Sequence, residues 1–243
     1  MRTICFLSIL LAFSSCKKKN GVCLKSTGYI ITQERNLGDF SVITIYNDID
    51  LIITQDTINK ATVKAGENII DYIFTEELQN DTIKIYNGNK CNWYRSYKKP
   101  IEINLHVKNL NEIVVYGAGN ITSTNTITGN KFGINGWETG ADMKLKLDVD
   151  TAFASVHTGP GVITYTGSAT ISSAYIAGNG YIYLQDLQTQ KTSVNNSGIS
   201  DIHVKASDYL SSQIFSKGNT IYYGAPTTLI TEDSGSGELI NGN

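Results

Sequence analysis

The sequence is short of several residue types, and each shortage argues against a class of protein. The chain has only 3 histidines, and none of His106, His157 and His203 has a Cys or His partner at metal-ligand spacing, so no metal site is predicted. The formal net charge is −2, and no region carries the basic stripe that nucleic-acid binding requires. Beyond the N-terminus, no run approaches about 18 consecutive apolar residues, so no transmembrane helix is expected.

What is present favours β-structure. The chain has 22 glycines and 14 tyrosines but only 3 prolines. Together with many Thr, Ile and Asn residues, this composition is typical of strands joined by tight turns. No window shows an apolar stripe with the 3.6-residue period of a helix. The sequence therefore predicts an all-β protein.

The N-terminus has the layout of a lipoprotein signal peptide. Arg2 precedes an apolar run over 4–13 and then Phe13-Ser14-Ser15-Cys16. This motif resembles a bacterial lipobox, at which a signal peptidase cuts before a cysteine that carries lipid. We predict a signal peptide over 1–15, lipidation at Cys16 and a tether over 16–27. An ordinary secretory peptide with an incidental cysteine is the alternative.

Two further features bear on the mature chain. Lys17 is not the Asp associated with inner-membrane retention, which favours an outer-membrane lipoprotein and leaves its periplasmic or surface-exposed face open. Outside the cytoplasm, disulfides can form, so Cys23 and Cys91 are candidates for a bridge. Two free thiols are the alternative.

The body of the chain changes texture at residue 117. Residues 28–116 are expected to form longer strands, over 40–46, 49–54, 61–65, 69–75, 82–86, 101–107 and 112–116. In 117–243, glycine-rich turns recur at Gly117, Gly140, Gly159, Gly178, Gly198, Gly218 and Gly235. A period of about 20 residues, with two short strands per unit, predicts a parallel β-solenoid or β-helix-like repeat. Residues 28–243 could also form one continuous domain, and a sandwich of long strands is the rival fold.

Alternation along the repeats assigns side chains to faces. The pairs expected to point inward are Ile163/Tyr165, Ile182/Leu184, Ile202/Val204 and Ile221/Tyr223. The outward stripe is expected to contain Thr122, Lys144, Thr164, Tyr183, His203 and Tyr222. This stripe holds no acid and no nucleophile beside a base, so no catalytic residue and no cofactor is assigned.

Three segments, taken in order, carry a family resemblance. They are an entry segment over 36–43, an early strand over 48–55, and the turn Ile221-Tyr222-Tyr223-Gly224-Ala225-Pro226. With the lipobox and the repeated Gly-x-Gly turns, the chain from about residue 30 resembles the auto-transporter adhesin head GIN domain family of bacterial envelope proteins. The resemblance implies a parallel β-helix-like fold and an adhesive role, and it supplies no catalytic residues.

The best candidate for ligand binding is an insertion over 92–100, which brings aromatic and cationic residues between two expected strands. Trp93, Tyr94, Arg95 and Tyr97 are its candidate contact residues, because such side chains are enriched at recognition hot spots. The alternative is an insertion loop whose rings pack on the sheet beside Cys91.

Taken together, the sequence predicts a lipid-anchored, non-enzymatic envelope protein that acts as an adhesin or ligand-binding scaffold. Its partners would be the membrane, through the lipid, and a glycan or an envelope or host protein. Two alternatives stay open: a carbohydrate-active β-helix enzyme, and a purely structural assembly protein of the periplasm or outer membrane.

Overall fold

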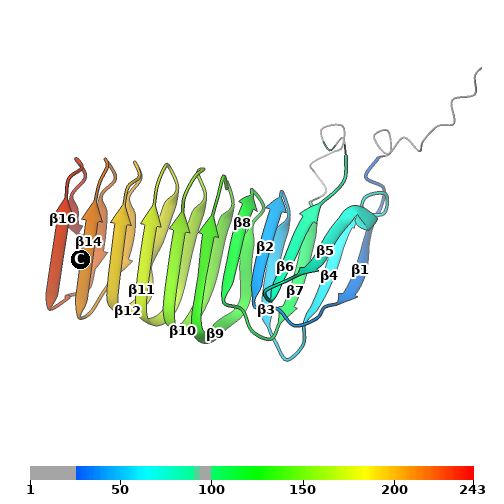
Figure 1. The fold of residues 1–243 in the computed structure, drawn as a ribbon, viewed down its shortest axis with the longest axis horizontal. Coiled ribbons are helices and arrows are strands. Elements are labelled where there is room, and N and C mark those ends of the chain that lie inside the picture. The colour runs from blue at the N-terminus through cyan, green and yellow to red at the C-terminus, as the bar shows by residue number, and fades with distance from the viewer. Residues whose placement is uncertain (1–25, 91, 93–99) are drawn as a thin grey trace, which may run out of the picture.

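The computed structural model describes residues 26–90, 92 and 100–243. Within these residues the protein is all β, with one short 3-10 helix, η2 (Ile70–Tyr72), and no α-helix. The strands join into one continuous sheet of 17 strands that winds into an elongated parallel β-solenoid, seen from the side in Figure 1. The predicted fold class is confirmed.

The solenoid has two broad faces, which we call face A and face B. Face A contains, in spatial order, β6 (Thr82–Asn87), β2 (Val42–Asn47), β8 (Glu112–Gly117), the second halves of β9 (Ile121–Gly136), β10 (Asp142–Val156), β11 (Val162–Ile176) and β12 (Tyr181–Asn196), then β14 (Tyr209–Ile214) and β16 (Thr228–Asp233). Face B contains β7 (Glu102–Val107), β3 (Asp50–Gln55), the first halves of β9 to β12, then β13 (Ile202–Lys205), β15 (Thr220–Tyr223) and β17 (Leu239–Asn241).

The repeat in the sequence sets the repeat in space. Asp142 lies beside Val162 and Val162 lies beside Tyr181, offsets of 20 and 19 residues, so each coil advances one strand spacing, about 4.8 Å. Along β10, buried Met143 and Leu145 alternate with outward lysines. Neither face of a single coil could bury such residues alone, so stacking on neighbouring coils forms the core. The two short strands expected in each coil are joined into one bent strand in β9 to β12.

One of the four inward assignments is wrong. Ile202 lies beside Thr220, and Val204 lies beside Tyr222, so Thr220 and Tyr222 follow the inward positions. Ile221 and Tyr223 therefore point outward, the reverse of the prediction. The chain advances 18 residues between these rungs, whereas the aligned isoleucines are 19 apart, and a shift of one residue moves a side chain to the other face.

The strands before residue 117 stack on the same two faces, but not in chain order. β2 lies between β6 and β8, and β3 lies between β7 and β9. Three antiparallel strands complete this end: β4 (Lys60–Gly66) pairs with β7, β1 (Ile30–Asn36) pairs with β4, and β5 (Ile73–Leu78) pairs with β6. The strand expected over 69–75 is wrong in its first half, because η2 occupies 70–72 and crosses between the faces before β5 begins.

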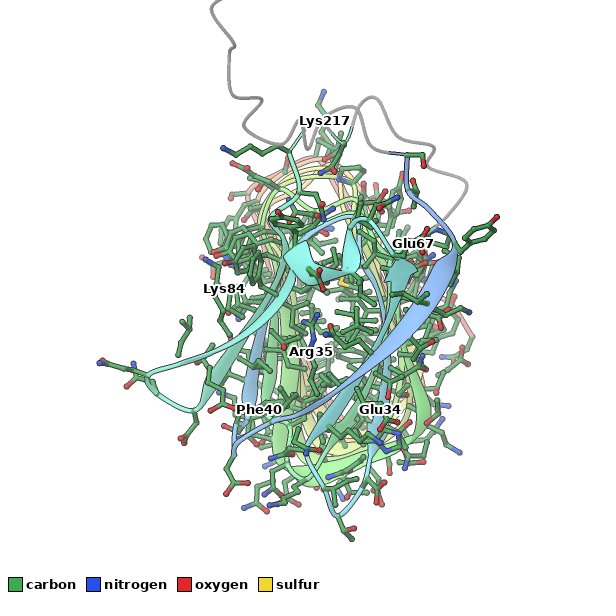
Figure 2. The ribbon with its side chains drawn as sticks, turned by 90° about the vertical axis from the view of Figure 1, so that its right-hand side faces the viewer. Glu34, Arg35, Phe40, Glu67, Lys84 and Lys217 are labelled. Carbon is green, nitrogen blue, oxygen red and sulfur yellow. The ribbon has the colours of Figure 1, made fainter. Side chains whose placement is uncertain are left out.

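Arg35 closes the core at this end, in the space between the two faces (Figure 2). Its guanidinium donates hydrogen bonds to the carbonyl oxygens of Ile73 at 2.6 Å and Ile70 at 3.3 Å. These carbonyls belong to the 3-10 turn and its exit, so Arg35 ties this crossing segment to β1. Burial lowers the pKa of Arg35, and nearby Asp71 opposes that shift.

Candidate functional site

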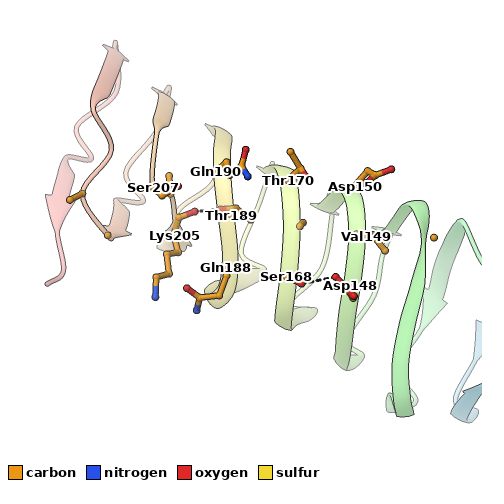
Figure 3. Close-up of a pocket in the computed structure, with 15 residues that line it drawn as sticks. Asp148, Val149, Asp150, Ser168, Thr170, Gln188, Thr189, Gln190, Lys205 and Ser207 are labelled. Atoms are coloured by element: carbon orange, nitrogen blue, oxygen red, sulfur yellow. Dashed lines mark hydrogen bonds between the residues drawn. The ribbon is translucent and has the colours of Figure 1, made fainter.

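A trough runs along the solenoid at the corner where face B turns into face A (Figure 3). Its volume is about 860 Å³, and it crosses successive coils from Gly129 to Ala225. Two rows of polar side chains flank it. The first rail is Asp148, Ser168, Gln188 and Lys205; the second rail is Asp150, Thr170, Gln190 and Ser207; the floor between them is Val149, Ala169, Thr189 and Ala206.

Strand register builds the rails. Asp148 lies beside Ser168, which lies beside Gln188, and the floor residues Val149, Ala169 and Thr189 are likewise in register. Since alternate residues of a strand project to opposite sides, the residues on either side of each floor position project outward together. Each coil therefore contributes one polar side chain to each rail.

On β11, the corner depends on a glycine just before the first-rail residue Ser168. Gly167 has φ +104°, and a Cβ atom there would overlap the carbonyl oxygen of Leu147 on the preceding coil. Only glycine meets both conditions, because it adopts positive φ without steric cost and has no Cβ. The backbone can therefore turn closely over the neighbouring coil, which places Ser168 beside Asp148.

Hydrogen bonds hold the trough in shape. Ser168 Oγ donates to Asp148 Oδ1 at 2.7 Å along the first rail. On the floor, the Thr189 and Thr192 hydroxyl groups both donate to the carbonyl oxygen of Lys205. These bonds tie the end of β13 to the coil beneath it, so the lining is fixed before any ligand arrives.

The two ends of the trough are also defined. At one end, the Gln55 side chain accepts from Thr128 N at 2.7 Å and donates to Thr128 O at 3.0 Å. At the other end, Gly224 and Ala225 line the trough, and Asn243 Nδ2 donates to the Gly224 carbonyl at 2.8 Å. The turn over 221–226, which carries part of the family resemblance, thus borders the trough.

Charge in the trough is unevenly placed. Asp148 and Asp150 lie together on β10, and Lys205 lies on β13. Three rungs separate them, or about 14 Å at the usual strand spacing. The residues between are neutral hydroxyls and amides, which can both donate and accept hydrogen bonds. Such a lining suits a neutral, hydroxyl-rich ligand better than an apolar one.

A row of aromatic rings lies on the outside of face A. The rings form three stacked pairs, with centroid distances of 4.9 Å for Phe74–Tyr86, 4.8 Å for Tyr46–Tyr116 and 3.7 Å for Trp137–His157. The Lys84 ammonium lies over Tyr46 and Tyr86, at 5.3 and 4.7 Å from the ring centroids. Because each ring turns a face toward its partner, that face is already occupied. We therefore assign these pairs to sheet stability, as cross-strand aromatic pairs contribute elsewhere.

A second aromatic group lies on the outside of face B. Tyr183 contacts His203 at a centroid distance of 5.2 Å, and His203 contacts Tyr223 at 6.2 Å. Burial lowers the pKa of His203, and Asp201 opposes that shift. Tyr183 and His203 lie outward as predicted, whereas Tyr222 does not, and Tyr223 takes its place.

Most of the site residues predicted from the sequence are not described by the structure. Cys16, Cys23, Cys91, Trp93, Tyr94, Arg95 and Tyr97 lie outside the described residues. Of the histidines, His106 contacts Asp56 at 2.9 Å, and His157 and His203 stand in the two aromatic groups. In the described part of the chain, no group of three or more His, Cys, Asp or Glu residues is placed to hold a metal ion.

The trough residues carry a signal in the sequence that the glycine repeat obscured. Polar pairs separated by one residue recur at intervals of 20: Asp148 and Asp150, Ser168 and Thr170, Gln188 and Gln190. Aligning the coils on the corner, rather than on the glycine turns, would place these pairs in one row.

No helix among the described residues is long and apolar enough to span a bilayer.

Comparison with known proteins places this fold. The family model described as "Putative auto-transporter adhesin, head GIN domain" matches residues 39–226. A crystal structure of a putative adhesin from Bacteroides fragilis NCTC 9343 superposes with a TM-score of 0.82 at 19% identity, covering 89% of this chain and 99% of that one. Two structures from Parabacteroides distasonis ATCC 8503 each superpose with a TM-score of 0.65. One is a putative adhesin at 21% identity, covering 89% of this chain and 100% of that one. The other is a putative lipid binding protein at 24% identity, covering 89% of this chain and 99% of that one. No curated protein matches the sequence. The family match spans most of the chain, and the chain therefore belongs to the auto-transporter adhesin head GIN domain family.

Proposed function

We propose that the protein is a non-enzymatic adhesin, anchored in the cell envelope by lipid at Cys16, that contacts its partner through the corner trough. The single observation that carries the proposal is the pair of polar rails. Two outward side chains from each of four coils line a cavity of about 860 Å³, and those of β10, β11 and β12 are in register. A surface of this length offers many weak contacts to an extended partner, which suits adhesion.

The other exposed groups fit this role less well. The rings on face A stack in pairs with centroid distances of 3.7–4.9 Å, so the stacked face of each ring is already in contact with another ring of the protein. The rails, in contrast, leave donors and acceptors open. Gln188 and Gln190 are exposed, and their amides can each donate and accept. Binding energy is therefore more readily available at the trough.

Anchoring belongs to the same proposal. Cleavage before Cys16 would leave a lipid-bearing thiol about ten residues ahead of the first described residue, with Lys17-Lys18-Lys19-Asn20 in the tether. Multiple acyl chains anchor stably, because each buried methylene contributes about 0.8 kcal/mol. Outer-membrane placement is part of the proposal, and its partners are a glycan or an envelope or host protein.

One observation keeps a carbohydrate-active enzyme as the second candidate. Asp148 and Asp150 both line the trough, and glycoside hydrolysis uses a pair of carboxyl groups. However, that chemistry needs the scissile bond between the two groups and one carboxyl in an apolar pocket. Here both aspartates are exposed on one strand, and Ser168 engages one of them. Release of new reducing ends from plant, microbial or host glycans, abolished by Asp150→Asn, would establish this candidate instead.

The test of the adhesin proposal uses a blocked trough. Thr170→Trp places an indole on the second rail, whereas Thr166→Trp places the same ring on an exposed position of β11 outside the trough. The lipidated protein in detergent is applied to glycan, host-protein and envelope-fraction arrays. We expect at least one partner to bind the wild type and the Thr166→Trp variant but not the Thr170→Trp variant. Equal binding by all three proteins would refute the trough as the contact surface.

A further inference from the structure

We infer that the trough binds a linear, uncharged, extended polysaccharide that lies along the solenoid axis with one hexose unit in each coil. The inference rests on the proposed function and specifies the ligand of the same site. Three properties of the trough carry it: its repeat distance, the chemistry of its rails and the placement of its charges.

Rail residues recur at successive rungs, since Asp148, Ser168 and Gln188 are in register, so the contacts repeat every 4.8 Å or so. A hexopyranose in an extended chain advances by nearly the same length. An extended peptide advances about 3.3 Å per residue, so its contacts would fall out of phase with the rails within two coils. The period therefore favours a sugar chain over a peptide.

The rail side chains suit vicinal hydroxyl groups. Carboxylates and primary amides are planar groups with two polar atoms, and the Ser and Thr hydroxyls between them can donate or accept as needed. On β10, β11 and β12, one such group stands on each side of the floor, as for Gln188 and Gln190. The floor consists of inward-facing residues such as Ala169 and Ala206, which are buried in the core, so the polar contacts offered to a sugar ring come from the two rails. Hydroxyls on both edges of the ring would be met at once.

The charges select against an anionic chain. Asp148 and Asp150 occupy the same coil, and Lys205, the one lysine among the described residues that line the trough, lies three rungs away. A uronate or sulfated sugar next to the two aspartates would face like charges, which disfavours binding. Neutral glucans and their relatives meet no such penalty.

The experiment measures affinity against chain length by isothermal titration calorimetry, with cello-oligosaccharides of two to six units as the extended probe. Maltohexaose is the curled control, and an oligogalacturonate is the anionic control. Because four coils carry rail residues, we expect affinity to rise with each added unit up to four or five and then level off. Maltohexaose and the oligogalacturonate should bind at least tenfold more weakly than cellohexaose.

Variants locate the site. Gln188→Ala with Gln190→Ala removes the two amides of one coil, and we expect roughly a tenfold loss of affinity for cellohexaose from two lost hydrogen bonds. Asp186→Ala, on the same strand but outside the trough, should change affinity less than twofold. Affinity that does not depend on chain length, or that Gln188→Ala with Gln190→Ala leaves intact, would overturn the inference.

The outcomes separate this inference from the proposed function. Suppose that no linear neutral oligosaccharide binds, yet Thr170→Trp abolishes binding to an array partner that Thr166→Trp still binds. Then the ligand class is wrong and the trough remains the contact surface. A peptide or anionic glycan recovered in that way would replace the sugar. If Thr170→Trp has no effect on any partner, the proposed function fails and the ligand class fails with it.

Discussion

Gly167 offers a direct test of how the trough is built. The residue stands where β11 enters the corner, with φ +104°, and an added Cβ would overlap the Leu147 carbonyl oxygen on the preceding coil. The change is Gly167→Ala, which adds one methyl group and no charge. Both the local backbone and the contact between two coils would have to adjust.

The size of the effect follows from these two costs. A non-glycine residue held at positive φ costs about 1–3 kcal/mol, and an overlap that forces packed neighbours to move costs about 1–3 kcal/mol more. In a protein of this size, 1 kcal/mol shifts Tm by about 2–4 °C. We therefore expect Gly167→Ala to lower Tm by roughly 10 °C.

The matched control is Gly140→Ala. Position 140 is an exposed turn with no positive φ, and an added Cβ would have Ala118 Cβ at 3.8 Å as its nearest neighbour. That is an ordinary contact, so Tm should change by less than about 2 °C. Thermal unfolding followed by far-UV circular dichroism compares the three proteins. If Gly167→Ala unfolds within 2 °C or so of both wild type and Gly140→Ala, the account of the corner is wrong.

Three further predictions concern stability and anchoring. Tyr165 is fully buried and its hydroxyl donates to the Phe153 carbonyl at 3.0 Å, so Tyr165→Phe should cost about 1–2 kcal/mol in urea unfolding, and an unchanged midpoint would contradict the role of this bond. Burial lowers the pKa of both His157 and His203 below the ordinary value of 6.5. As the pH falls through 6.5, the unfolded chain therefore binds more protons than the folded chain. The stabilising contribution of the two neutral histidines is full above pH 6.5 and declines below it. Replacing both histidines by Phe should flatten the decline in Tm between about pH 7 and pH 5, and an equal decline would argue against these groups. Cys16→Ser should move the protein from the membrane fraction to the soluble fraction and abolish labelling by radioactive palmitate, whereas retained labelling would place the lipid elsewhere.

Sequence periodicity was sufficient for the repeating half of the fold. Alternation such as Met143, Leu145 and Leu147 fixes which side of a strand faces the core, and recurrence at about 20 residues fixes the stacking. At Tyr222 and Tyr223 the predicted orientation is wrong, because the chain advances 18 residues between rungs. A shorter coil cannot be recognised from residue types, yet the resulting shift of one residue exchanges the inward and outward side chains.

The early strands could not be ordered from the sequence. β2 pairs with β6 and β8, which lie 40 and 70 residues later, and no local pattern encodes such distant pairing. The face A pair Tyr46–Tyr116 was missed for this reason. The trough residues were missed for another reason. A groove that crosses the coils is visible in the sequence only when the repeats are aligned on their corners, whereas here they were aligned on their glycine turns.

Carboxyl labelling tests directly whether the partner lies in the trough, without assuming what the partner is. The protein is treated with a carbodiimide and an amine, alone and saturated with whichever partner the arrays identify, and modified residues are quantified by mass spectrometry. Asp148 and Asp150 line the trough, while Glu34 on β1 and Glu138 in a turn are exposed away from it. We expect the partner to protect Asp148 and Asp150 and to leave Glu34 and Glu138 as reactive as before. Unchanged labelling of the two aspartates in the saturated complex would contradict it.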